Sequence, residues 1–95
     1  MKKDVKREIK KKMVERADIN IGKRGLTDSV LNEIDRRLND NEIVKVKILK
    51  SALAAEGIED RKKFAQILAE KLKVDAMEIR GYAIVLYRKR RKGTL

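Results

Sequence analysis

The sequence contains no cysteine and no histidine. Without cysteine, the chain has no disulfide framework and no thiol chemistry. Without histidine, it lacks the usual general base and the commonest metal ligand. A metal site would have to be built from carboxylates alone, and no acidic stretch has the spacing of an EF-hand loop. We therefore expect neither a metal ion nor any other cofactor.

Residues that could act as catalytic groups have no suitable neighbours in the sequence. Ser29 and Ser51 have no histidine to activate their hydroxyl groups. Asp35 and Glu70 each stand beside a basic residue, as surface charges usually do. No lysine lies in an apolar run, where burial would make it a nucleophile. The sequence therefore predicts that the protein is not an enzyme.

Long apolar segments are also missing. No run approaches the ~18 residues that a transmembrane helix needs. The charged N-terminal residues lack the apolar core of a signal peptide. We therefore expect a monomeric protein of the cytoplasm that does not act at a membrane.

Acidic residues are few relative to basic ones. The chain has 95 residues, enough for one domain with a thin core, and 43% of them are charged. Lysine and arginine number 26 and aspartate and glutamate 15, so the formal net charge is +11. A thermophile's surface of paired charges would explain the charged fraction but not this surplus. Because such a surplus attracts polyanions, we expect nucleic acid as the partner, ahead of an anionic membrane.

Hydrophobic periodicity divides the chain into helices and strands. The first predicted helix spans residues 2–15. The second runs from the N-cap Thr27 to residues 39–41, with Val30, Leu31, Ile34 and Leu38 buried. The third starts near Glu59, with Phe64, Ile67, Leu68 and Leu72 buried. The predicted strands cover residues 17–21, Ile43–Leu49, 75–80 and 82–88, and a loop is expected over Ser51–Gly57. The last strand is apolar on both faces.

The order helix, strand, helix, strand, helix, strand, strand is typical of an α/β domain. Strand–helix–strand units imply parallel neighbours joined by right-handed crossovers. The last two strands are too close in sequence for a crossover, so they should be antiparallel or splayed apart. We predict a single two-layer domain over residues 1–88, with helices mainly on one side of a mixed four-stranded sheet. Residues 89–95 form a basic tail that we expect to be disordered.

The turn Gly22-Lys23-Arg24-Gly25 is the most informative motif. Glycines allow positive φ and close approach to a ligand, and the helix that follows can hold a phosphate at its N-terminus. Lys23 and Arg24 add two full charges at the tip. Alternatively, the glycines only reverse the chain between a strand and a helix. A P-loop or a dinucleotide fingerprint would need further motif residues that are absent, and the similar loop of KH domains lies between two helices.

Basic residues also share one face of the first predicted helix. At about 100° per residue, Lys3, Lys6, Arg7 and Lys10 fall together on that face. A solvated helix surface is the simplest alternative. A membrane-surface helix is less favoured because the apolar stripe is thin and contains no aromatic residue. Binding of nucleic acid together with the turn is the other interpretation, and the residues alone leave both open for these four cations.

Aromatic residues are scarce, with only Phe64, Tyr82 and Tyr87 in the chain. Phe64 has the spacing of a core residue. Tyr82 and Tyr87 lie on opposite faces of one predicted strand, so at most one of them would face a ligand. Stacking on splayed bases is therefore a poor fit, and binding through phosphates and RNA shape fits better.

These motifs resemble the CRM domain, a family named for chloroplast RNA splicing and ribosome maturation. The similarity is found in the segments Ile21–Thr27, Val30–Leu38, Ile43–Lys47 and Gly81–Arg88. It implies a fold similar to the C-terminal domain of bacterial translation initiation factor three, and association with precursors of the large ribosomal subunit. It also implies that Gly22–Gly25 contacts the RNA backbone and that the basic first helix binds RNA. The tail after Arg88 is not part of the shared pattern.

The charge and the turn leave two kinds of function open. The first is an RNA-binding factor in ribosome assembly. The second is a protein-interaction module that docks on an acidic partner, and a generic basic nucleic-acid binder is a weaker form of the first. RNA binding predicts that Lys23, Arg24 and the first-helix cations form one connected patch. A docking module predicts dispersed charge and an exposed apolar groove.

Overall fold

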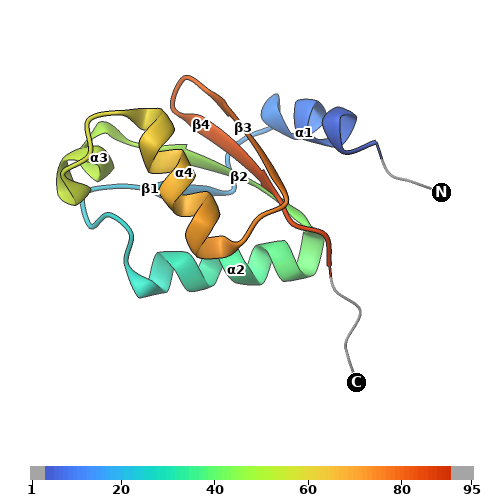
Figure 1. The fold of residues 1–95 in the computed structure, drawn as a ribbon, viewed down its shortest axis with the longest axis horizontal. Coiled ribbons are helices and arrows are strands. Elements are labelled where there is room, and N and C mark those ends of the chain that lie inside the picture. The colour runs from blue at the N-terminus through green and yellow to red at the C-terminus, as the bar shows by residue number, and fades with distance from the viewer. Residues whose placement is uncertain (1–3, 91–95) are drawn as a thin grey trace.

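The computed structural model describes residues 4–90, which form helices packed on one four-stranded sheet (Figure 1). The helices are α1 (Val5–Met13), α2 (Asp28–Asn41), α3 (Lys50–Glu56) and α4 (Arg61–Leu72). The strands are β1 (Ile19–Ile21), β2 (Ile43–Ile48), β3 (Ala76–Arg80) and β4 (Ala83–Tyr87). None of the helices in this part of the chain is long and apolar enough to cross a membrane.

The strands follow the order β1-β2-β4-β3 across the sheet. β1 and β2 are parallel neighbours, and β3 and β4 form an antiparallel pair, as the sequence pattern predicts. β4 lies between β2 and β3 and is antiparallel to both. The β2 and β3 strands therefore run in the same direction without pairing, because the final hairpin inserts β4 between them. The α/β class and the mixed four-stranded sheet are confirmed.

Helices cover both faces of the sheet. α2, α3 and α4 share one core with Ile84 and Leu86 of β4. On the opposite face, Ile9 and Met13 of α1 form a smaller core with Val85 and Tyr87 of β4. The expected layer of helices on one side is thus formed by α2, α3 and α4, and α1 adds a layer on the other side.

The segment Ser51–Gly57, which the sequence pattern predicts as a loop, lies mostly in helix α3. Ala52 and Leu53 of this helix are buried in the main core. The residue before the helix, Leu49, makes no side-chain capping bond, so the usual starting signal is missing. Burial of the two apolar side chains, rather than capping, therefore explains why this segment is helical.

The turn between β1 and α2 is shaped by contacts with α3. The N–H of Gly25 donates to the carbonyl of Gly22 at 2.9 Å, and Gly25 has φ +71°. The N–H of Leu26 donates to Oε2 of Glu56 at 2.7 Å, and a Cβ atom on Gly25 would overlap that carboxylate. A Cβ atom on Gly22 would come no closer than 3.5 Å to Leu49 Cδ1. Only the second glycine is therefore required by the geometry of the turn.

Charged side chains fasten the end of α1 to β2. Asp18 accepts a hydrogen bond of 3.0 Å from the N–H of Lys45, and its carboxylate lies 3.0 Å from Lys12 Nζ. The ammonium of Lys45 donates to the carbonyls of Met13 and Glu15, where the helix ends. Burial acts to raise the pKa of Asp18, but the hydrogen bonds from Lys45 and Lys12 and the charge of Lys12 outweigh it and lower that pKa. The contacts with Lys45 and Lys12 therefore favour the ionised carboxylate of Asp18.

Arg88, which follows β4, connects this strand to two helices. Nη1 donates to Oδ1 of Asp35 and to the carbonyl of Leu72, both at 2.8 Å. Nη2 donates to Oδ1 of Asn39 at 2.8 Å and to the carbonyl of Asp35 at 3.1 Å. A guanidinium with four acceptors from α2 and α4 is a structural group, so Asp35 is more than a surface charge.

The first two residues of the predicted tail, Lys89 and Arg90, make backbone contacts with the domain. The N–H of Lys89 donates to Oδ2 of Asp75 at 2.7 Å, and the N–H of Arg90 donates to Oε2 of Glu42 at 2.8 Å. The backbone of these two residues is thus attached to the domain. Residues 91–95 of the predicted tail lie outside the described part of the chain.

The two glycines of the turn should respond differently to substitution by alanine. Gly25→Ala should lower the free energy of unfolding by roughly 1–3 kcal/mol, because it strains a positive φ and displaces the carboxylate that accepts from Leu26. Gly22→Ala should leave stability unchanged or raise it by up to ~1 kcal/mol. Urea denaturation of both variants measures the difference. Equal losses of stability would contradict the described geometry of the turn.

The anchor of α1 should weaken in acid. Because Asp18 has a lowered pKa in the folded protein, its contribution is complete above the unfolded pKa of about 3.9 and is lost as pH falls through the folded value. Asp18→Asn should therefore cost about 1 kcal/mol at pH 7, and the difference from the wild type should shrink below about pH 4. Denaturation curves measured from pH 7 to pH 3 provide the test, and a difference that does not change with pH would contradict it.

Candidate nucleic-acid interface

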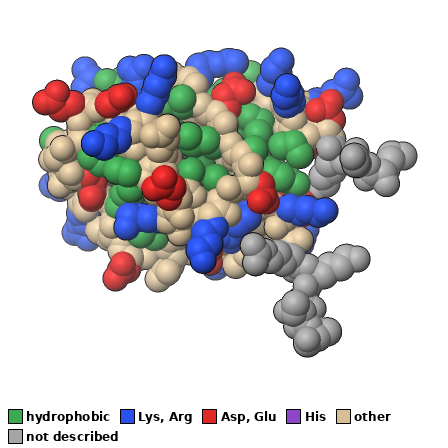
Figure 2. Space-filling model, in the orientation of Figure 1, with side chains coloured by type: hydrophobic (Ala, Val, Ile, Leu, Met, Phe, Trp, Pro, Cys, Tyr) green, Lys and Arg blue, Asp and Glu red, His purple; other side chains and the backbone are tan. Residues whose placement is uncertain are grey.

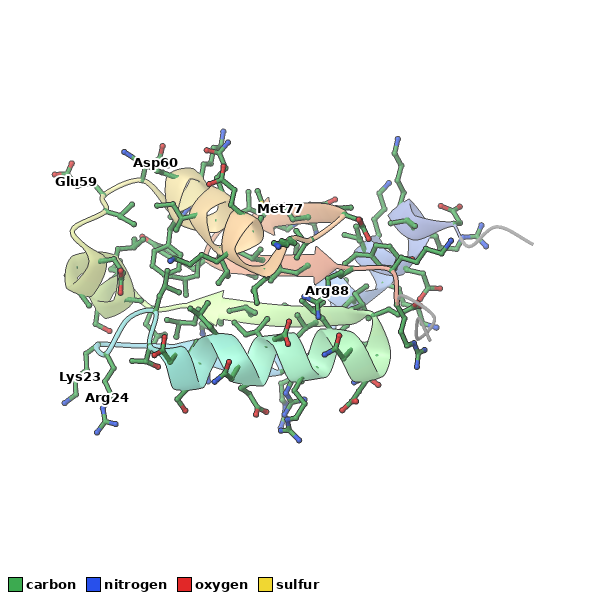
Figure 3. The ribbon with its side chains drawn as sticks, turned by 60° about the horizontal axis from the view of Figure 1, so that its bottom comes forward. Lys23, Arg24, Glu59, Asp60, Met77 and Arg88 are labelled. Atoms are coloured by element: carbon green, nitrogen blue, oxygen red, sulfur yellow. The ribbon has the colours of Figure 1, made fainter. Side chains whose placement is uncertain are left out.

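Lys23 and Arg24 occupy the tip of the turn between β1 and α2. Both residues are exposed, and their side chains extend away from the body of the protein (Figure 3). Neither side chain makes an ion pair or a hydrogen bond with another described residue. An anion can therefore approach both cations without breaking an existing interaction.

The start of α2 contributes less to this site than the sequence suggests. The N–H of Leu26 is already bound to Glu56, and the N–H of Val30 donates to Oγ1 of the N-cap Thr27 at 3.1 Å. These two N–H groups are bound within the chain and are not available to an anion. Asp28 adds a negative charge in the first turn of α2, so the attraction for an anion at the turn comes mainly from the two side chains at its tip.

The predicted cations of the first helix are exposed where they are described. Lys6, Arg7 and Lys10 lie on the solvent side of α1, whose buried side is formed by Ile9 and Met13. Asp4 is the N-cap of the helix, and its Oδ1 accepts a hydrogen bond of 3.1 Å from the N–H of Arg7. The fourth predicted cation of this face, Lys3, lies outside the described residues.

The turn and α1 do not form the single connected patch that the RNA hypothesis predicted. In Figures 1 and 3 the turn lies at one end of the molecule and α1 at the other. The physical reason is the second apolar face of β4, which holds α1 on the side of the sheet opposite to α2. The two groups of cations therefore contact different parts of any ligand that reaches both.

The surface also lacks the feature expected of a docking module. Among the described large hydrophobic residues, Val14 and Leu49 are exposed, and they lie on separate segments. On the face shown in Figure 2, basic and acidic side chains are interspersed. The charge on this face is thus dispersed, as the docking hypothesis predicted, but Val14 and Leu49 do not form the apolar groove that it requires.

The three aromatic side chains are used within the fold. Phe64 is completely buried in the main core, and Tyr87 is buried beneath α1. Tyr82 is half-buried, and the guanidinium of Arg61 lies over its ring at 5.0 Å from the centroid. This arrangement agrees with the expectation that base stacking makes little contribution.

Two hollows in the surface are lined largely by charged residues. One, of about 480 Å³, includes Arg88, whose guanidinium already has four acceptors. The other, of about 330 Å³, lies over the sheet beside the end of α1 and includes Arg16, Lys45, Lys47 and Arg80. The sequence pattern identified Lys45 and Lys47 only as the polar side of a strand. Their meeting with Arg16 and Arg80 depends on strand order, which the local sequence does not reveal.

Two relatives are similar to most of the chain. A "probable RNA-binding protein" of Methanocaldococcus jannaschii is 34% identical over 70 residues, which are 74% of this chain and 49% of that protein. A "probable RNA-binding protein" of Pseudomonas aeruginosa is 36% identical over 72 residues, which are 76% of this chain and 64% of that protein. The chain thus spans about half to two-thirds of the length of these relatives.

A solved structure and a family model cover nearly the whole chain. The solution structure of a Staphylococcus aureus protein, a candidate RNA-binding protein by its name, has a TM-score of 0.67 and 24% identity, and the match covers 94% of this chain and 88% of that one. That likeness shows the fold alone. The model of the CRS1/YhbY (CRM) domain matches residues 1–88. Together with the two relatives above 30% identity, this match shows that the chain belongs to the CRS1/YhbY (CRM) domain family.

Proposed function

We propose that this protein binds RNA through the sugar–phosphate backbone, with Lys23 and Arg24 as its principal contacts and the cations of α1 as a second group. The observation that supports this most directly is the pair of exposed, unpaired cations at the tip of a turn fixed by Gly25 and Glu56. Membership of the CRM family and the names of both relatives support RNA as the ligand. These names describe RNA-binding proteins rather than enzymes.

The proposed contacts are to phosphates and ribose rather than to base edges. Lysine and arginine are the usual partners of phosphate oxygens, and such contacts position a protein without reading sequence. The rings of Phe64, Tyr82 and Tyr87 are all used in packing or in the contact with Arg61, so they are poorly placed for stacking on splayed bases. A structured RNA, whose backbone presents phosphates in a fixed arrangement, fits these groups best.

The family resemblance suggests the biological setting. We extend the proposal to precursors of the large ribosomal subunit, in the cytoplasm, where structured RNA is abundant. On this proposal the protein recognises the shape of folded ribosomal RNA, and the net charge of +11 increases the rate of encounter. The alternative of docking on an acidic protein has less support, because the exposed apolar residues Val14 and Leu49 do not form a shared groove.

Replacing Lys23 and Arg24 together by alanine should weaken RNA binding without affecting the fold. Both side chains are exposed and unpaired, so the free energy of unfolding should change by less than ~0.5 kcal/mol. Each phosphate that the variant no longer binds should reduce the log–log salt dependence of binding by about 0.7–0.9, so two phosphates should remove nearly two units. Titrations of a folded ribosomal RNA fragment at several salt concentrations measure both affinity and slope.

The matched control is the double variant Lys62→Ala, Lys63→Ala. These lysines are adjacent, exposed and located on α4, so the control removes the same charge from another surface. If both double variants showed the same decrease in affinity and in salt slope, the turn would have no special role. The protein would then be a basic domain that binds RNA diffusely.

Binding should also favour structured RNA over duplex DNA of the same length. The proposed contacts include ribose hydroxyls and depend on the A-form shape, which DNA lacks, whereas single-base mismatches should matter little. Competition titrations at fixed salt concentration compare the ligands directly. Equal affinity for the structured RNA and the duplex DNA would reduce the protein to a generic polycation.

A further inference from the structure

One row of residues across the sheet is left uncovered by α1. Strand register places Asn20 beside Lys47, Lys47 beside Ala83, and Ala83 beside Arg80. The neighbours of these residues along their strands, such as Val46 and Ile84, point into the main core. Because side chains alternate along a strand, the row itself lies on the face that carries α1. We call these four residues the open row.

The position of α1 explains why this row is accessible. Ile9 and Met13 pack on Val85 and Tyr87, which lie farther along β4 from the open row. Asn20, Lys47 and Arg80 are exposed, and Lys47 and Arg80 line the hollow of about 330 Å³. Ala83 is partly buried against the core beneath α1, and it also lines the hollow, between Lys47 and Arg80 in the row.

The cations around this hollow differ in how much they are used by the fold. The ammonium of Lys45 is bound by the carbonyls at the end of α1, and the carboxylate of Glu15 is paired with Lys12 at 3.2 Å. Arg16 and Lys47 have no ion pair with another described residue. Arg80 has only a long contact of 3.6 Å with Glu78, and both of those side chains are more than a third exposed. Three cations are therefore available to an anion above Ala83.

The open row also lies between the two groups of cations described above. Asn20 precedes the first glycine of the turn by two residues, so the row is at the turn's end of the sheet. Arg16 belongs to the segment that joins α1 to β1. A ligand that extends from the turn towards α1 can therefore cross the row.

We propose that the open row, together with Arg16, is a further phosphate-binding subsite, at which RNA backbone crosses the sheet between the turn and α1. This inference rests on the proposed RNA-binding function and adds the path that the RNA follows. Lys47 and Arg80 flank a shallow floor and bind one or two phosphates from opposite sides. A protein partner is a poorer fit, because charged residues outnumber Ala17, Tyr82 and Ala83 in the lining of the hollow, whereas the centre of a protein interface is usually depleted of charge.

The first test removes the two flanking cations. Lys47→Ala combined with Arg80→Ala should weaken binding to the same folded ribosomal RNA fragment and lower the salt slope by about 0.7–0.9 for each phosphate that is no longer bound. The thermal midpoint of unfolding should hardly change, because neither side chain supports the fold. The Lys62→Ala, Lys63→Ala variant is again the control for removal of two charges. If the open-row variant matched this control while the turn variant bound more weakly, the subsite would be refuted and the proposed function would stand.

The second test locates the RNA without removing a cation. Because the chain has no cysteine, Asn20→Cys provides a single attachment point for a thiol-linked photocrosslinker within the open row. Gln66→Cys on the exposed side of α4 provides the matched control. We expect efficient crosslinking to the RNA from position 20 and little from position 66. Equal yields from the two positions, or more from position 66, would overturn the proposed path. If the turn variant also behaved like the control, the proposed function itself would fail.

Discussion

β4 must bury apolar side chains on both of its faces, and the positions of the helices follow from this requirement. Ile84 and Leu86 face one way and Val85 and Tyr87 the other, and all four are buried. A strand of this kind is stable only at the centre of a sheet with cover on each side. The central place between β2 and β3, the layer formed by α2, α3 and α4, and the separate position of α1 are three consequences of the same pattern.

The cover supplied by α1 also divides the basic residues into two classes. Lys12 and Lys45 hold the end of α1 against β2, and Arg88 holds the end of β4 against α2 and α4. The side chains of Lys23 and Lys47 make no such contact with another described residue. Because α1 is short, it leaves one end of its sheet face open, and Arg16, Lys47 and Arg80 line the hollow there. The basic residues behind the net charge of +11 therefore differ in whether they are free to bind a ligand.

Local patterns were sufficient to predict most elements but not their arrangement. Alternation located the strands, and Thr27 marked the start of α2, where its hydroxyl does accept from Val30. Helix α3 was missed because its burial depends on distant residues and it has no capping side chain. The order of β2, β4 and β3 is fixed by long-range pairing. The sequence alone therefore could not show whether the turn and α1 form one connected patch. It also could not show that Arg80 lies beside Lys47 in the same hollow.

The glycines of the turn illustrate how a motif can have a structural explanation beside the functional one. Gly25 is required because its φ is positive and because Glu56 approaches from α3, and both reasons hold without any ligand. The presence of this glycine therefore says little about phosphate binding. Lys23 and Arg24 are different, because they contribute no contact to the fold and, in a chain with a surplus of positive charge, oppose its compaction. A polyanion can therefore bind both side chains without breaking a contact of the fold.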